Sequence, residues 1–470
     1  PDSADTSFLP LQASLSFFKT QNTVPNRFSR TNYEKRVRST TEKMSHLIDS
    51  LPINPEEKKR FTNFLVRETI NYIKTYQTKY MSFFDSYDVE VNTLNHLKKL
   101  FRDLTQPSSS FYDFLHTIQH QTSVLSEPIL SLTHMEELND FDFLNRIFES
   151  KDDVAPIAEY QKLISQLVSD LESSSPAENK LSPHLTPAAR ISCNILKQTT
   201  DSYLVKAHEC LQKMGVPERF HEPFYKPILL LHKFGLVELK NSINALWKTQ
   251  FSPKIDHFFS QFPFNFQSSE LASVDEVKTI LSPKGEFNHA LGEIRALCSY
   301  QDHQWGPHNP DHLHIETKIY HDLNQLSRLS NILLDAEGNP KPLNLQIHAV
   351  PTLASPDTPS APILSYLVLG AHSVYNFNQD PSWQPISIEW WKFETSLIGI
   401  ELINKKTQNK TYRTTHVINA PWGFFSLLKL GVQQKDLVWV WGLASHEQTD
   451  FRKVSFRFDQ DPRTILQISE

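Results

Sequence analysis

The stretch "NAPWGFFSLLKLG", residues 419–431, separates two runs that have the apolar pattern of β-strands. Pro-Trp-Gly breaks the extended pattern, and the apolar residues after it fall at helical spacing over too short a length for a helix that stands alone. Such a turn needs a larger body to pack against, so we expect it to close an open end of a β-sandwich. The residues with this structural role are Pro421, which ends the strand, Trp422, which fills a gap, Gly423, which lets the chain turn, and Phe425 and Leu428, which are buried.

The sequence around this stretch predicts a sheet domain. After position 342 about eight short runs alternate or are continuously apolar, with turn residues between them, which is typical of strands. Few helical patterns intervene, so a sandwich is favoured over an α/β sheet. The runs are "LNLQIHAVP", "ILSYLVLGAHS", "ISIEWWKF", "LIGIELIN", "TYRTTHVIN", "DLVWVWGLA", "KVSFRF" and "TILQI".

The first part of the chain has a different composition. The first glycine is Gly215, whereas six of the eight tryptophans lie at or beyond position 383. A glycine-free region suits long helices. "NPEE" at 54–57 is a helix start, with Asn54 as the cap and proline in the first turn. The helix after it carries one apolar stripe that we expect to be buried: Phe61, Leu65, Thr69, Tyr72, Tyr76, Tyr80 and Phe83.

These patterns predict a multidomain chain, α then β: an elongated helical-bundle region followed by a C-terminal all-β sandwich with a short inserted helix. We expect four segments in order. They are an extended arm (1–25), an N-terminal helical domain ending in a Ser/Pro-rich linker (26–187), a second helical domain (188–340) and the sandwich (341–470).

Composition and motifs exclude several classes of function. A net charge of −6 argues against a dedicated nucleic-acid binder. No stretch has the about 18 continuous apolar residues of a membrane span. The glycine-rich phosphate and dinucleotide motifs, GxSxG and HExxH are absent, and we expect no cofactor. Three cysteines without a CxxC leave free thiols and a Cys193–Cys210 bridge both open.

One histidine-rich segment, 303–321, is a candidate metal site. Its candidate ligands are His303, His308, His312 and His314, because closely spaced imidazoles beside carboxylates suit a transition metal. Against this, two prolines hold the segment extended and no cysteine or carboxylate pair completes a shell. Incidental histidines are the favoured interpretation, and a histidine-dependent metal hydrolase is the alternative.

Four tryptophans are candidates for contact with a protein partner: Trp390, Trp391, Trp439 and Trp441. Aromatic residues are enriched at interfaces. In a strand Trp439 and Trp441 share one side, and valines occupy the other, so a central position in the sandwich is the competing interpretation. Trp390 and Trp391 are adjacent, so one is expected in the core while the other is exposed.

Four segments in order resemble the periplasmic portion of the IcmF/TssM family, the scaffold proteins of type VI and Dot/Icm type IVB secretion. They are "NYIKTYQTKYMSFFDSYDV" (71–89), "PSSSFYDFLHTIQHQTSVL" (107–125), "FPFNFQSSELASVDEVKTILSPKGEFNHAL" (262–291) and the opening stretch. Together they span nearly the whole chain. The sequence departs from the family pattern at Ala420, Ile280, Leu281, Ser282 and Lys284, which indicates a divergent branch and leaves the particular secretion system open.

The resemblance implies a non-enzymatic scaffold, without catalytic residues to transfer. It implies the periplasmic portion of an inner-membrane protein whose membrane anchor and cytoplasmic region are not in this sequence. The implied partners are a DotU/TssL-type inner-membrane protein and an outer-membrane lipoprotein bound by the sandwich, and we expect a homo-oligomer in the assembled complex. A soluble helical adaptor with a glycan-binding sandwich, acting through Trp390 or Trp391, is the remaining alternative.

Overall fold

The computed structural model divides into two compact units, Pro1–Ser242 and Ile243–Glu470. It describes residues 7–8, 17–20, 22–126, 139–149, 155–173, 185–307, 313–352, 360–377, 382–414, 417–443 and 452–467. Most of the predicted arm at 1–25 and of the linker at 172–187 lies outside these residues. The finer domain boundaries at 187/188 and 340/341 stay predictions.

The first unit is built from helices, with short strand pairs between β1 (Ser7–Phe8) and β3 (Val24–Pro25) and between β2 (Phe18–Thr20) and β4 (Tyr87–Val89). Its principal helix, α3 (Pro55–Asp85), begins where the sequence predicts, because the Asn54 side chain accepts a 2.8 Å hydrogen bond from the Glu57 amide. The other helices are α1 (Arg30–Asn32), α2 (Ser39–Ser50), α4 (Leu94–Leu104), α5 (Ser110–Thr122), α6 (Asp142–Phe148), α7 (Ile157–Glu172), α8 (Pro187–Leu196), α9 (Tyr203–Lys213) and α10 (Glu222–Leu246), within which the division between the units falls.

The core of the first unit is rich in tyrosine, and several of its buried hydroxyls donate to main-chain carbonyls. Tyr76 donates to the Gln121 carbonyl and Tyr160 to the Phe224 carbonyl, each at 2.8 Å. These bonds offset the cost of burying a phenol. The predicted stripe of α3 is buried at Thr69, Tyr76, Tyr80 and Phe83 but not at its start, where Phe61 is exposed. No other part of the described chain covers the first turns of α3 on that side.

The second unit begins with helices α11 (Ser252–Ser260), α12 (Val274–Leu281), α13 (Glu286–Arg295) and α14 (Thr317–Leu333), with a hairpin of β5 (Cys298–Gln301) and β6 (Gln304–Pro307). Ser273 caps α12 by accepting a hydrogen bond from the Glu276 amide. The segment Ser282–Gly285 separates α12 from α13. Cys193, Cys210 and Cys298 are free thiols.

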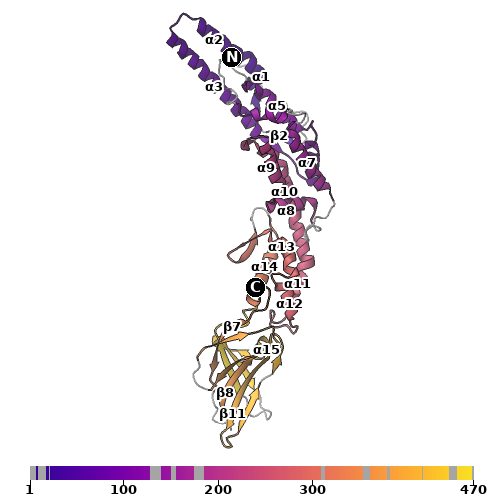
Figure 1. The fold of residues 1–470 in the computed structure, drawn as a ribbon, viewed down its shortest axis with the longest axis vertical. Helices are drawn as coiled ribbons and strands as arrows, with labels where there is room; N and C mark the ends of the chain where they lie inside the picture. Colours follow the sequence, from indigo (N-terminus) through magenta and orange to yellow (C-terminus); the bar gives the residue numbers. More distant parts are fainter. Residues whose placement is uncertain are drawn as a thin grey trace. The chain divides into compact units, whose positions relative to one another are not determined.

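The C-terminal part is a β-sandwich of two antiparallel sheets (Figure 1). The first has the order β10-β7-β16-β15-β14, and the second has the order β12-β11-β8-β9 with β13 paired to β11. The bounds are β7 Leu343–Val350, β8 Ser360–Leu369, β9 His372–Asn376, β10 Gln384–Ile388, β11 Thr395–Asn404, β12 Lys410–Thr414, β13 Ile418–Asn419, β14 Val432–Gln433, β15 Val438–Leu443 and β16 Arg452–Phe458.

The predicted fold class is confirmed: helices are followed by a sandwich into which α15 (Gly423–Leu430) is inserted. Two details of the strand prediction are wrong. Residues 464–467 of "TILQI" form turns, and the main-chain carbonyls of Ile465 and Gln467 accept hydrogen bonds from the Arg328 guanidinium instead of strand partners. β10 ends at Ile388, so the adjacent tryptophans occupy the turn that follows it.

None of the helices in the described part of the chain combines the length and the apolar character that a membrane crossing requires.

Candidate functional site

Trp422 joins the sandwich to the helical part of the second unit. Its side chain is fully buried and stacks on Trp390, with 4.3 Å between ring centroids and 16° between planes. The indole N–H donates a 2.8 Å hydrogen bond to the carbonyl of Ala272, in the turn before α12. The opening stretch of the sequence therefore packs on the segment around Ala272 as well as on the strands.

The turn in this stretch is made by Trp422 and not by Gly423, which corrects the expectation from the sequence. Trp422 has a left-handed backbone (φ 61°), a conformation that costs a non-glycine residue about 1 kcal/mol. Gly423 is needed for a close approach instead: a Cβ there would lie 2.7 Å from the Ser396 hydroxyl oxygen on β11. Pro421 is half-buried, while Phe425 and Leu428 are buried.

Helix α15 contacts both sheets. Phe424 packs against Phe458 of β16, with 5.8 Å between ring centroids, and Gly423 lies against Ser396 of β11. The Trp441 indole donates to the Leu427 carbonyl at 2.9 Å. These contacts account for the helix even though its sequence is too short to fold alone.

Three of the four tryptophans predicted to bind a partner are buried within this chain. Trp390, Trp439 and Trp441 each keep about 2% of their surface, and Trp391 is half-buried. Trp390 donates to the Lys341 carbonyl at 3.1 Å, and the Arg463 guanidinium lies over the ring of Trp439 at 5.0 Å. These side chains offer little surface to another molecule, and their role in binding stays a prediction.

Exposed aromatic side chains lie on the outer side of the second sheet, at positions the sequence interpretation did not select. Tyr366 on β8 is opposite Tyr375 on β9 and opposite Gly399 on β11, and Tyr412 on β12 is opposite Glu401 on β11. Tyr375 is 48% exposed and Tyr412 is 66% exposed. We call Tyr366, Tyr375 and Tyr412 the tyrosine face.

The glycine at position 399 shapes this face. A Cβ there would lie 2.2 Å from the ring of Tyr366, so that ring lies flat across the neighbouring strand. Alternation places the neighbours of Tyr375, Val374 and Asn376, in the core. The face is therefore a fixed platform of rings on a packed sheet.

The electrostatics of the tyrosine face leave it without net charge. The Glu401 carboxylate, nearly buried, pairs with the Lys410 ammonium at 3.0 Å. Burial, together with Tyr412, Glu401 and Tyr375, raises the pKa of Tyr366, so its phenol is neutral at neutral pH. Uncharged rings with hydroxyl groups suit contact with a protein surface.

The histidine candidates do not form a metal centre in the described residues. His308 and His312 lie outside those residues; His303 occupies the turn between β5 and β6, and His314 is exposed before α14. Within the described residues, no three histidine, cysteine or acidic side chains come together in a metal-ligating cluster.

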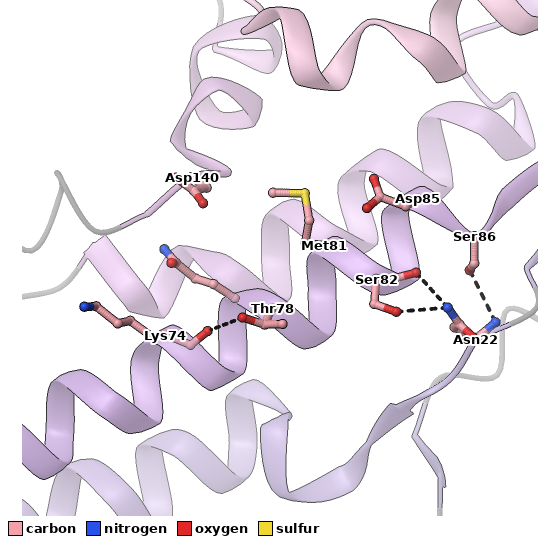
Figure 2. Close-up of a pocket in the computed structure, with 9 residues that line it drawn as sticks. Asn22, Lys74, Thr78, Met81, Ser82, Asp85, Ser86 and Asp140 are labelled. Atoms are coloured by element: carbon pink, nitrogen blue, oxygen red, sulfur yellow. Dashed lines mark hydrogen bonds between the residues drawn. The ribbon is translucent and has the colours of Figure 1, made fainter.

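A groove of about 730 Å³ runs along one side of α3 in the first unit (Figure 2). Lys74, Thr78, Met81 and Asp85 line it at helical steps, and the Asn22 side chain closes one end by donating to the Ser82 carbonyl and hydroxyl. The Thr78 hydroxyl bonds its own helix. Among the described residues that line it, none is a histidine or a cysteine.

Comparison with known proteins gives a fold and no close relative in sequence. No family model matches the sequence, and neither does any curated protein. A solved chain described as "Type VI secretion system membrane core complex" shares the fold at 15% identity and a TM-score of 0.62, covering 97% of this chain and 90% of that one. A second, described as "Type VI membrane complex", matches at 14% identity and a TM-score of 0.59, over 96% of this chain and 86% of that one.

Proposed function

We propose that this protein is a non-enzymatic scaffold of a bacterial secretion-system membrane complex. The observation that carries the proposal is that the fold match to the type VI core-complex chain runs through both units, over 97% of the sequence. The motif resemblance to the IcmF/TssM family supports the same assignment independently of the coordinates. Both solved chains are described as type VI proteins, which favours a type VI system over Dot/Icm.

In this role the helices act as a spacer and the sandwich acts as a docking module. The chain would lie in the periplasm as part of an inner-membrane protein, and a DotU/TssL-type protein would associate with its membrane anchor. An outer-membrane lipoprotein would bind the sandwich. We assign that contact to the tyrosine face, because Tyr375 and Tyr412 are exposed and the uncharged rings lie on a packed sheet, whereas Trp390, Trp439 and Trp441 are buried.

The test is calorimetric titration of the full chain with the outer-membrane lipoprotein of its secretion system. We expect binding, and we expect Tyr375→Ser combined with Tyr412→Ser to weaken it at least tenfold, because exposed tyrosines at an interface are typical hot spots. Phe393→Ser, which removes another exposed ring of the sandwich, is the matched control and should keep full affinity.

Two results would count against the proposal. Failure of the wild-type chain to bind any envelope component of its system would refute the scaffold role. Binding that survives the double tyrosine substitution unchanged would refute the assignment of the tyrosine face and leave the scaffold role standing.

A further inference from the structure

The α2–α3 hairpin of the first unit carries an apolar surface that the described chain leaves uncovered. α2 and α3 lie side by side, joined by the short turn at 51–54 (Figure 1). Four large apolar side chains on this hairpin are between 47% and 56% exposed: Met44, Leu47, Phe61 and Phe64. We call these four residues the hairpin patch.

The helical phase places all four on the same side of the hairpin. Buried Thr41 and Ile48 mark the line along α2 that faces α3, and half-buried Leu65 and buried Thr69 mark the corresponding line on α3. At about 100° per residue, Met44 and Phe61 each lie about 50–60° to one side of these lines. Leu47 and Phe64 lie about 110–120° to the same side, each beyond its neighbour.

Met44 and Leu47 on α2, and Phe61 and Phe64 on α3, are displaced in the same rotational sense about their own helix axes. Because the two helices face each other and are antiparallel, this places both pairs on the same side of the hairpin. The patch is therefore one continuous surface. It extends the stripe of α3 that is buried from Thr69 onward, and its side chains have the size and chemistry of that core.

The charges beside the patch differ between the two helices. The exposed ionic residues on the patch side are Arg36, in the π-helical segment Tyr33–Arg38 that precedes α2, Lys43 on α2, and Glu57, Arg60 and Glu68 on α3. Glu68 also lies 3.3 Å from the Arg67 side chain, and both are exposed, so that pairing is weak. One edge of the patch is thus basic, and the other edge, with two carboxylates and one guanidinium, is net acidic.

We infer that the hairpin patch binds the same patch on a second copy of this chain, with α2 of one copy lying over α3 of the other. A two-fold axis parallel to the helices brings the basic edge of each hairpin onto the acidic edge of its partner. Counted from the turn at 51–54, Met44 is level with Phe61 and Arg36 is nearly level with Glu68. The apolar side chains and the opposite charges are then matched in one arrangement, a four-helix contact.

The size of the patch sets the strength of the contact. Four half-exposed side chains of this kind bury about 400 Å² per copy, roughly half of the 800 Å² per partner of a standard interface. The dimer is therefore weak in isolation. The experiment must reach high protein concentration.

The test is sedimentation equilibrium of the full chain from about 5 to 500 µM. The wild type should show reversible dimerisation, and Phe61→Ser combined with Phe64→Ser should weaken the dimer at least tenfold. Val237→Ser, at another exposed apolar position of the first unit, should leave the dimer unchanged. Circular dichroism should show the same helix content in all three proteins, because none of these side chains is buried.

A charge exchange tests the arrangement of the helices. Arg36→Glu should weaken the dimer several-fold by placing two carboxylates together, and adding Glu68→Arg in the same chain should restore it. A double variant weaker than both single variants would overturn the placement of α2 over α3.

A wild-type chain that stays monomeric at the highest concentration would overturn the inference of a second copy. In that case, binding to vesicles of anionic lipid that depends on Phe61 and Phe64 would assign the patch to a membrane surface instead.

Discussion

Replacing Trp422 with alanine should unfold or nearly unfold the second unit while sparing the first. The side chain is fully buried, and truncating a buried aromatic residue costs about 3–5 kcal/mol. The Ala272 carbonyl also loses its donor, which adds about 1–3 kcal/mol when water does not replace it. The total, about 4–8 kcal/mol, approaches the whole stability of a typical domain, about 5–15 kcal/mol.

The chain offers a selective readout for this experiment. All eight tryptophans lie in the second unit, so tryptophan fluorescence during urea unfolding follows that unit, while circular dichroism follows the helices of both units. For a slope near 2–3 kcal/mol per molar urea, the fluorescence midpoint should fall by about 2 M. The transition of the first unit should not move.

Two further substitutions separate packing from the hydrogen bond. Trp422→Phe keeps much of the stack on Trp390 but loses the indole N–H, so it should show an intermediate loss. Trp391→Ala removes a half-buried neighbour and should cost less than either. An unchanged fluorescence midpoint for Trp422→Ala would refute the structural role of this residue, and a folded variant that fails only in partner binding would assign the stretch to the interface instead.

Two smaller effects follow from single contacts. Gly423→Ala should destabilise the second unit by about 1–3 kcal/mol through overpacking, because the new Cβ meets the Ser396 hydroxyl oxygen at 2.7 Å, and the fluorescence midpoint should fall accordingly. Ser396→Ala in the same chain should recover part of the lost stability, and no recovery would contradict this steric cause. In the first unit, the hydrogen bond from Lys226 lowers the pKa of Asp88. The stabilisation from this pair is therefore present above the unfolded pKa of about 4 and is lost as the pH falls through the pKa of Asp88 in the folded state. The difference in unfolding free energy between wild type and Asp88→Asn should be below about 1 kcal/mol, because the pair is exposed. In urea titrations this difference should shrink between pH 5 and pH 2, and a constant difference would contradict the prediction.

The fold could be predicted because its determinants are local. Asn54 with Pro55, and Ser273 three residues before Glu276, mark helix starts by hydrogen bonds within one turn. Alternation over "LNLQIHAVP" fixes which side chains of β7 face the core. Such signals depend on neighbours along the chain, so they can be recognised without knowledge of the tertiary structure.

The candidate surfaces could not be predicted, because periodicity shows which residues share a side but not whether anything covers that side. Phe61 continues the stripe of Tyr76 and Tyr80 in sequence, yet only the latter two meet other helices. The tryptophans show the opposite case: the sequence offers them as exposed contacts, and three of the four are buried. The structure stacks Trp390 on Trp422, which lies more than thirty residues later in the turn before α15, and no local pattern encodes that contact.

One signal for the tyrosine face is present in the sequence. In "SYLVLGAHSVYNF" Tyr366 and Tyr375 each stand between residues that are buried in the structure, which places these tyrosines on the outer side of their strands. The glycine in "LIGIE" marks where a ring from the next strand crosses the sheet. The observation on the glycine needs the pairing of β8 with β11, which the sequence alone does not provide.

The two proposed contacts belong to different units, and this has a consequence for assembly. The hairpin patch is in the first unit and the tyrosine face is in the second, so one chain can use both contacts at once. Each is small, and linked weak contacts reinforce one another because the second forms at high effective concentration. A substitution in either surface should then reduce assembly of the whole complex by about the same factor as it reduces its own isolated contact. That behaviour suits a scaffold, because subunits associate stably only where both contacts can form.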